Sequence, residues 1–157
     1  MRDTDKRRPA IEHRQTNSIP IPEQSRNERT TPIPEQPRAW KPGQFDHERL
    51  DAYWVAREAL ARGDRLAQQL PRGYAKLADQ LRRALLSAYL GVAEAACRTG
   101  NDRLARFRCA RGEAAEAAAA LDAVAMLRLA KSSDVDIIIS LLRRLAAMLT
   151  RLAKLSR

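Results

Sequence analysis

The chain has 157 residues, of which 45% are hydrophobic and only 4% aromatic. This length supports one domain with an aliphatic core and is too short for two such domains. The 29 lysines and arginines outnumber the 19 acidic residues and give a net charge of +10, which favours nucleic acid or an acidic protein surface as a partner.

The cysteines and the hydropathy pattern indicate the compartment. Two cysteines, Cys97 and Cys109, do not make a disulfide framework, and we expect them to be free and buried in a reducing environment. The basic N-terminus has no apolar run after it, as a signal peptide would, and no segment reaches the roughly 18 apolar residues of a membrane span. We therefore expect a soluble protein of the cytoplasm that does not bind membranes.

Residues 1–44 differ from the rest of the chain and hold seven of its eight prolines. This segment is predicted to be a disordered, basic tail, because it has too few large apolar residues to offset its ordering entropy. Within it, "PIPEQSR" at 20–26 returns as "PIPEQPR" at 32–38. The repeat suits a docking peptide presented twice, and it also suits a spacer grown by local duplication. The residues of the docking interpretation are Pro20, Ile21, Pro22, Glu23, Gln24, Pro32, Ile33, Pro34, Glu35 and Gln36.

From residue 45 to residue 157 the spacing of apolar residues is helical. A first helix is predicted over 45–70, with Asp46 as its N-cap. Pro71 ends it, and a second helix is predicted over 74–98. The residues expected to face the core are Leu50, Tyr53, Trp54, Leu60, Ala67 and Leu70 in the first helix, and Leu77, Leu81, Ala84, Ala88, Val92 and Ala95 in the second.

Two further helices follow a turn at 99–102, where Gly100 suits a left-handed cap and Asp102 suits an N-cap. The third is predicted over 102–131, with a core stripe of Leu104, Phe107, Ala110, Ala114, Ala117, Leu121 and Val124. The last helix is expected to be capped by Ser133, with a seam of Ile138, Leu142, Leu145, Leu149 and Leu152. Short turns between four amphipathic helices predict an all-α, up-down-up-down four-helix bundle.

Some apolar residues lie off these stripes. They are either an interface between subunits or the edge of a broad core stripe, and the pattern leaves both open. The interface interpretation comprises Tyr89, Ile137, Leu141, Met148 and Leu155.

The excess of positive charge is concentrated on the second and fourth helices. Residues 131–157 carry six basic residues against two acids, and "LRR" occurs in both helices. Surface arginines often only cover apolar neighbours with their stems. We expect instead a row of unpaired arginines on adjacent helices, which would attract phosphates without reading bases, while aromatic stacking platforms are nearly absent. The residues predicted to bind nucleic acid are Arg82, Arg83, Arg98, Arg143, Arg144, Arg151 and Lys154.

No catalytic constellation is recognisable. The only histidines are His13 and His47, and no histidine lies in the last three helices to complete a metal site in the bundle. Glu94, Glu113 and Glu116 are better explained as ion-pair partners of arginines than as metal ligands. We therefore expect a protein that is not an enzyme and that has no cofactor and no metal.

Several segments resemble a known family. "LRRALLSAYLGVAEAACR" (81–98) is similar to the "LRRAxxSxxxNIAEGxxR" segment of small bacterial four-helix-bundle proteins, which include the proteins of ribosomal RNA intervening sequences and the accessory variability determinants of diversity-generating retroelements. "LDAYWVAREAL" (50–60) resembles their "LxVYxxAxxL" pattern, and "RLARFRCARGEAAEAAAAL" (103–121) resembles "FxRFLxxAxGSxxELExxL". The sequence departs from these patterns at Gly91, Ala95 and Glu113, where the family has Asn, Gly and Ser.

The resemblance implies a non-enzymatic bundle that assembles as a homopentamer with a basic surface. Members from retroelements are thought to bind a reverse transcriptase and nucleic acid, RNA or DNA. It implies that the off-stripe apolar residues form an assembly face, that the arginines form a ring of positive charge, and that five tails display the duplicated peptide to an unidentified protein partner.

Overall fold

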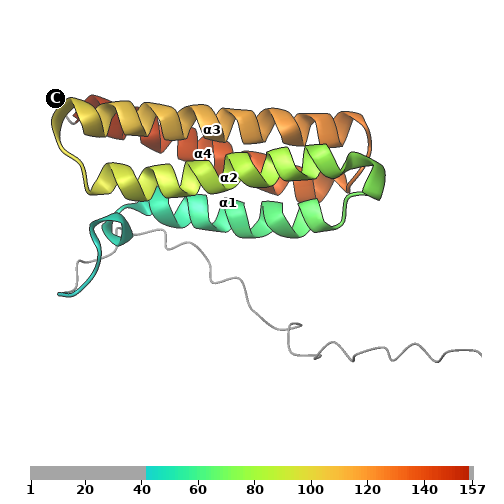
Figure 1. Ribbon diagram of the computed structural model, residues 1–157, viewed down its shortest axis with the longest axis horizontal. Helices are drawn as coiled ribbons and strands as arrows, with labels where there is room; N and C mark the ends of the chain where they lie inside the picture. Colours follow the sequence, from blue (N-terminus) through green and yellow to red (C-terminus); the bar gives the residue numbers. More distant parts are fainter. Residues whose placement is uncertain (1–41, 156–157) are drawn as a thin grey trace, which may run out of the picture. The chain divides into compact units, whose positions relative to one another are not determined.

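The structure is a computed structural model that describes residues 42–155, and this part of the chain forms four long α-helices without a strand. A short 3-10 helix, η1 (Asp46–Arg49), precedes α1 (Asp51–Gln68). A second one, η2 (Arg72–Tyr74), leads into α2 (Ala75–Ala96), and α3 (Gly100–Met126) and α4 (Ser132–Leu155) complete the chain. Consecutive helices run in opposite directions (Figure 1), so the predicted up-down-up-down bundle is confirmed. None of the described helices combines the length and apolar character that crossing a membrane requires.

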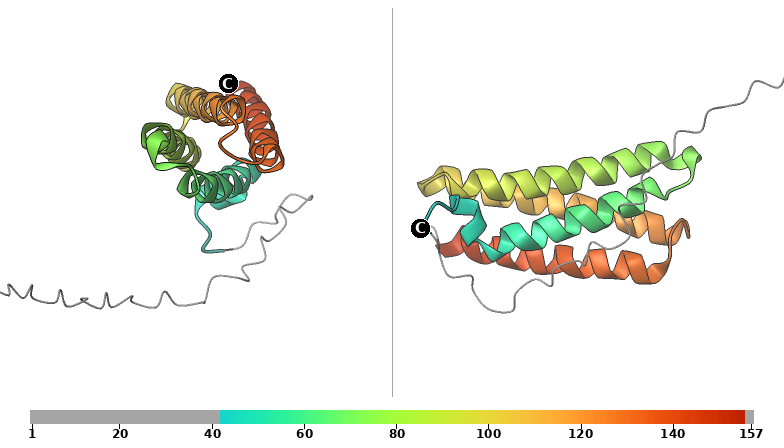
Figure 2. Two further views of the ribbon diagram at one scale, coloured as in Figure 1. Left: turned by 90° about the vertical axis from the view of Figure 1, so that its right-hand side faces the viewer. Right: turned by 90° about the horizontal axis from the view of Figure 1, so that it is seen from below.

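The order of the helices around the bundle decides which side chains can share a face. Each helix packs against its neighbours in sequence, and α1 also packs against α4. Among the described residues no Cα atom of α2 lies within 8 Å of a Cα atom of α4, and the two helices lie at opposite corners in the view along the bundle axis (Figure 2). The two helices with the most positive charge are therefore diagonal partners, and the expectation that their arginines lie on adjacent helices is wrong.

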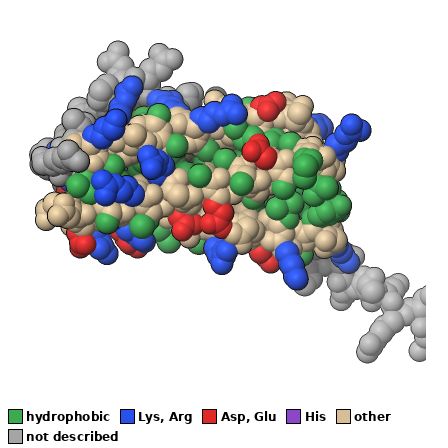
Figure 3. Space-filling view, turned by 90° about the horizontal axis from the view of Figure 1, so that it is seen from above, with side chains coloured by type: hydrophobic (Ala, Val, Ile, Leu, Met, Phe, Trp, Pro, Cys, Tyr) green, Lys and Arg blue, Asp and Glu red, His purple; other side chains and the backbone are tan. Residues whose placement is uncertain are grey.

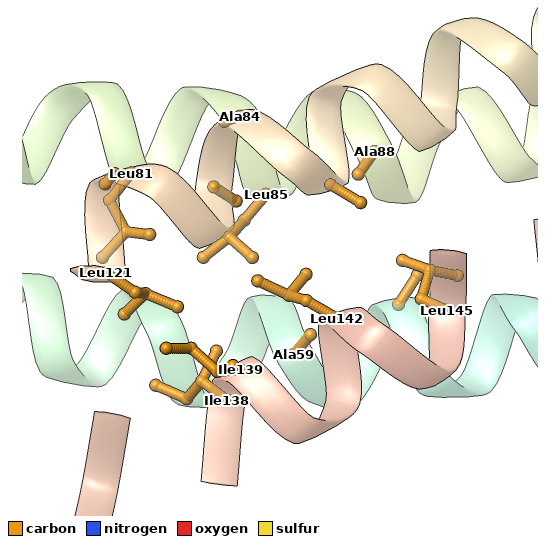
Figure 4. Packing of buried hydrophobic residues seen from close by; sticks show 14 of the residues in the cluster. Ala59, Leu81, Ala84, Leu85, Ala88, Leu121, Ile138, Ile139, Leu142 and Leu145 are labelled. Carbon is orange, nitrogen blue, oxygen red and sulfur yellow. The ribbon is translucent and has the colours of Figure 1, made fainter. Parts of the chain in front are cut away.

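Small and aliphatic side chains fill the interior, as the composition predicted. In the interior of the bundle Leu81 of α2 lies near Leu121 of α3, and Leu85 of α2 lies near Leu142 of α4 (Figure 4). The predicted stripe of α3 is buried at every position, and those of α2 and α4 are buried except for the half-buried Leu77 and Leu152. Periodicity therefore identified the inner faces of three helices.

The predicted inner face of the first helix is wrong except at Ala67, which is buried. Leu50 has an extended backbone (φ −93°, ψ 120°) and separates η1 from α1, so residues 45–70 are not one helix and Asp46 does not cap α1. The large residues Leu50, Tyr53, Trp54 and Leu60 are half-buried at the sides of α1. The core positions belong mainly to smaller side chains: Ala52, Val55, Ala56, Ala59, Gly63, Leu66 and Ala67.

Two left-handed residues set the turns at the ends of α3. Gly100 has φ +56°, as predicted, but Thr99 holds the N-cap position and Asp102 lies within the first turn. At the other end Arg128 has φ 54°, and the N–H of Leu129 donates to the carbonyl of Val124 at 3.0 Å. This closure ends the helix at Met126, before the predicted residue 131. The carbonyl of Lys131, one residue before α4, then accepts its first backbone hydrogen bonds, so Ser133 is not the N-cap.

Candidate nucleic-acid interface

The arginines of α2 are engaged by carboxylates of neighbouring helices. Arg82 Nε lies 2.9 Å from Oδ1 of Asp64 in α1, and Arg83 Nη2 lies 3.7 Å from Oε1 of Glu116 in α3. Gln80 joins the second pair, since its amide donates to Glu116 and accepts from Arg83. The expected row of unpaired arginines is therefore wrong for α2.

Arg98, at the end of α2, also has acidic partners. Its Nη1 lies 3.3 Å from Oδ2 of Asp102 and its Nη2 lies 3.9 Å from Oε2 of Glu94. Oε2 of Glu94 also lies 2.5 Å from Nε of Arg106, and this close carboxylate raises the pKa of Arg106. The expectation that Glu94 and Glu116 pair with arginines is confirmed.

The predicted cations of α4 have no such partners. Arg143, Arg144, Arg151 and Lys154 are exposed, and within residues 42–155 none of their side chains makes a hydrogen bond or ion pair. Their charges are available to a ligand, whereas each charge of Arg82, Arg83 and Arg98 is already partly compensated.

The structure adds two arginines of α3 that the charge count by helix did not select. Arg111 Nη1 donates to Oγ1 of Thr150 in α4 at 3.2 Å. Because α3 and α4 are antiparallel, one turn back along α3 and one turn on along α4 bring Arg108 and Lys154 to the same level. Arg108 also has no partner among the described residues. The spacing of three places Arg108 and Arg111 on the same face of α3. Which helix lies beside that face depends on how the helices pack, and the sequence spacing does not show it.

These residues define what we call the basic face, formed by α3 and α4. Its members are Arg108, Arg111, Arg143, Arg151 and Lys154. Small exposed side chains, Ala115, Ala119 and Ala147, lie between them, and Asp122 and Asp136 are its acidic residues. Figure 3 shows this side of the bundle, where basic side chains are spread over a mainly uncharged surface and a few acidic ones lie among them. Arg144 lies about 100° further round α4 from Arg143, away from α3.

The residues of the predicted subunit interface fall into two groups on either side of α1. On α4, Ile137 is 45% exposed, Leu141 and Met148 are half-buried against the core, and Leu155 carries no described side chain. On α2, Tyr89 is half-buried and shares a 2.6 Å hydroxyl–hydroxyl hydrogen bond with Tyr53 of α1. Leu86 and Leu90 of α2 are each 46% exposed and were not among the predicted interface residues.

The remaining site predictions have different outcomes. The duplicated peptide, from Pro20 to Gln36, lies outside the described residues. Cys97 and Cys109 are free but exposed, so the expectation that they are buried is wrong. Residues 42–155 contain no group of three or more histidine, cysteine or acidic side chains placed to hold a metal ion.

Comparisons with known proteins do not identify the chain. No family model matches the sequence, and no curated protein matches it. The resemblance to the bacterial four-helix-bundle family therefore stays a prediction.

Proposed function

We propose that this protein acts by binding, and that it holds the phosphate backbone of nucleic acid on the basic face. The observation that carries the proposal is the contrast between the two charged helices. The arginines of α2 are paired with carboxylates, whereas Arg143, Arg151 and Lys154 of α4 and Arg108 of α3 have no acidic partner among the described residues.

The composition of this face supports contact with phosphates and not with bases. Guanidinium groups fork onto phosphate oxygens, and the small side chains between them leave the surface open to an extended backbone. The described aromatic rings are concentrated elsewhere, around Tyr53, so the face has no stacking platform for single-stranded bases. We therefore expect binding that depends strongly on salt and weakly on sequence.

The test compares two matched triple variants. In the first, Arg108, Arg111 and Arg151 become Gln; in the second, Arg82, Arg83 and Arg98 become Gln. Both remove three positive charges, so they differ in location and not in net charge. Binding to a DNA duplex and to a structured RNA, both with 5′-hydroxyl ends, is measured by fluorescence anisotropy across a salt series.

We expect the first variant to flatten the slope of log affinity against log salt by about 2 to 3 for the duplex, since each phosphate contact contributes about 0.9. The second variant should change the slope by less than about 1. Equal losses in both variants would show that only net charge matters, and that result would contradict a localised interface.

A second function is favoured by the duplicated "PIPEQ" peptide, which would make the protein an adaptor that recruits a protein partner. Deleting residues 1–43 separates the two functions. Binding to nucleic acid should fall only modestly on deletion, because the basic face is retained. An adaptor would lose nearly all partner binding.

The resemblance noted in the sequence adds two elements to the proposal. It makes a homopentamer the expected assembly, in which the basic face is repeated around a ring. It also makes a reverse transcriptase the first protein partner to test, by co-purification with and without residues 1–43.

A further inference from the structure

A pocket of about 450 Å³ lies at one end of the bundle, away from the middle of the basic face. It is formed where η1 crosses the end of α2 and the start of α3. Arg49, Arg98 and Arg103 line it together with Cys97 and Thr99, and Asp46 is the only acidic side chain of its lining. Three guanidinium groups from three segments therefore converge on one hollow.

Two of these arginines have no partner to compensate their charge. Arg98 is shared by Glu94 and Asp102, but within residues 42–155 neither Arg49 nor Arg103 makes a hydrogen bond or ion pair through its side chain. The side chains that line the pocket therefore carry two more positive than negative charges, three arginines against Asp46, while Glu94 and Asp102 compensate Arg98 from outside the lining.

Arg103 is held in place while one of its donors stays unsatisfied. Its Cζ lies 5.5 Å from the centroid of the Phe107 ring, a cation–π contact that restrains the guanidinium. Its Nε is buried and has no hydrogen-bond partner. Since this atom has no accessible surface, a ligand in the pocket would meet the charge and the terminal nitrogens of Arg103.

The start of α3 adds to this environment. Thr99 lines the pocket at the N-cap position and its side chain makes no capping hydrogen bond, which leaves the first N–H groups of α3 without that partner. The positive end of the helix dipole reinforces the guanidinium groups there.

We infer that this pocket binds the phosphate group of a phosphomonoester. A phosphomonoester carries close to two negative charges at neutral pH, which matches the excess charge better than the single charge of a phosphodiester. Guanidinium groups on separate segments can satisfy several phosphate oxygens at once. The pocket is large enough to take a nucleotide or the 5′ end of a nucleic acid. This site does not depend on the proposed role of the basic face.

Cys97 provides a direct probe, because its thiol lines the pocket, whereas the exposed Cys109 lies outside the lining. The rates of alkylation of both thiols are measured by peptide mass spectrometry on the full chain. The probes are inorganic phosphate, dimethyl phosphate, AMP, and one oligonucleotide prepared with a 5′-phosphate or a 5′-hydroxyl. At about ten times its dissociation constant, a bound ligand should slow the labelling of Cys97 about tenfold and leave Cys109 unchanged.

The pattern of protection identifies the source of the phosphate. Protection by AMP or inorganic phosphate, but not by either oligonucleotide, assigns the pocket to a small phosphomonoester. Protection by the 5′-phosphorylated oligonucleotide, but not by its 5′-hydroxyl form, assigns it to the end of a nucleic acid. Equal protection by dimethyl phosphate, or no protection by any probe, would overturn the inference.

Variants separate this site from the basic face. Arg49→Gln and Arg103→Gln should each raise the dissociation constant obtained from the protection of Cys97 at least fivefold, a loss of about 1 kcal/mol. Arg65→Gln serves as the matched control, because Arg65 is exposed on α1 and has no partner among the described residues. Since Arg49 is exposed, its variant tests the pocket even if Arg103→Gln fails to fold. The triple variant of Arg108, Arg111 and Arg151 should lose duplex binding and keep the protection of Cys97.

Discussion

The hydroxyl groups of Tyr53 in α1 and Tyr89 in α2 lie 2.6 Å apart and join two helices of the bundle. The ring centroids of the two residues are 5.0 Å apart, and those of His47 and Trp54 lie 4.5 and 5.3 Å from that of Tyr53. Most of the described aromatic side chains thus form one cluster between η1, α1 and α2. This cluster anchors η1 and, with it, one wall of the pocket that contains Arg49.

This relationship predicts how stability depends on alkaline pH. Burial, followed by the hydrogen bond with Tyr89, raises the pKa of Tyr53 from 10.0 to about 12. The folded state therefore retains a proton that the unfolded state releases, and the free energy of unfolding should fall as the pH rises from about 10 to about 12. Chemical denaturation followed by circular dichroism across this range measures the effect.

A pair of variants tests the cause of that shift. Tyr89→Phe removes the hydrogen bond but leaves most of the burial, so the tyrosinate absorbance of Tyr53 should develop at a lower pH. Tyr74→Phe is the control, because Tyr74 is 37% exposed and outside the cluster. An unchanged alkaline transition in Tyr89→Phe would mean that the hydrogen bond does not contribute.

Two glycines within helices predict opposite effects of the same substitution. A Cβ at Gly91 would lie 3.0 Å from Cβ of Ala110 and 3.5 Å from its Cα, so Gly91→Ala should push α2 from α3. We expect a net loss of about 1 kcal/mol, since overpacking outweighs the gain in helix propensity. A Cβ at Gly112 meets nothing within 4 Å, and Gly112→Ala should stabilise by about 0.5 to 1 kcal/mol. Urea denaturation measures both, and stabilisation by Gly91→Ala would contradict the close approach.

The error in α1 shows which part of the fold periodicity does not predict. Ranking residues by size placed Tyr53 and Trp54 in the core, whereas the structure buries Ala59 and Gly63 there. Leu85 of α2 explains the choice, because its Cδ1 occupies the space that a Cβ on residue 63 would need. Where helices approach closely, the small residues face inward and the large ones cover the seams on either side. That preference depends on the neighbouring helix and is invisible in a single segment.

The candidate interface was predictable only in part, for a similar reason. The composition predicts the excess of positive charge. The basic side chains of α4 stay unpaired because few acidic residues lie near them. The pairs of α2 join residues far apart in the sequence, such as Arg82 with Asp64 and Arg83 with Glu116. The pocket likewise requires η1 to bring Arg49 to Arg98 and Arg103. Each of these depends on the order of helices around the bundle.

The Arg82–Asp64 pair predicts a small effect on stability. Their side chains are 38% and 42% exposed, so water screens the attraction. Arg82→Gln should lower the free energy of unfolding by less than about 1 kcal/mol. Thermal melts at low and high salt provide the measurement, with Arg143→Gln as a control that breaks no ion pair. A loss of several kcal/mol would show that the pair is more important to the packing of α1 on α2 than its exposure indicates.

The apolar line of α4 predicts where an assembly can be broken without unfolding the chain. Ile137 is 45% exposed and contributes little to the core, so Ile137→Asp should preserve the helical circular dichroism signal. If Ile137 lies in an interface between subunits, the buried carboxylate should dissociate the assembly, and light scattering should change from five chains to one. Met126→Asp is the matched control, because Met126 is 76% exposed at the end of α3 and outside this line. An assembly that survives Ile137→Asp and Met126→Asp alike would exclude this part of α4 from the interface and would favour the exposed Leu86 and Leu90 of α2 as the contact.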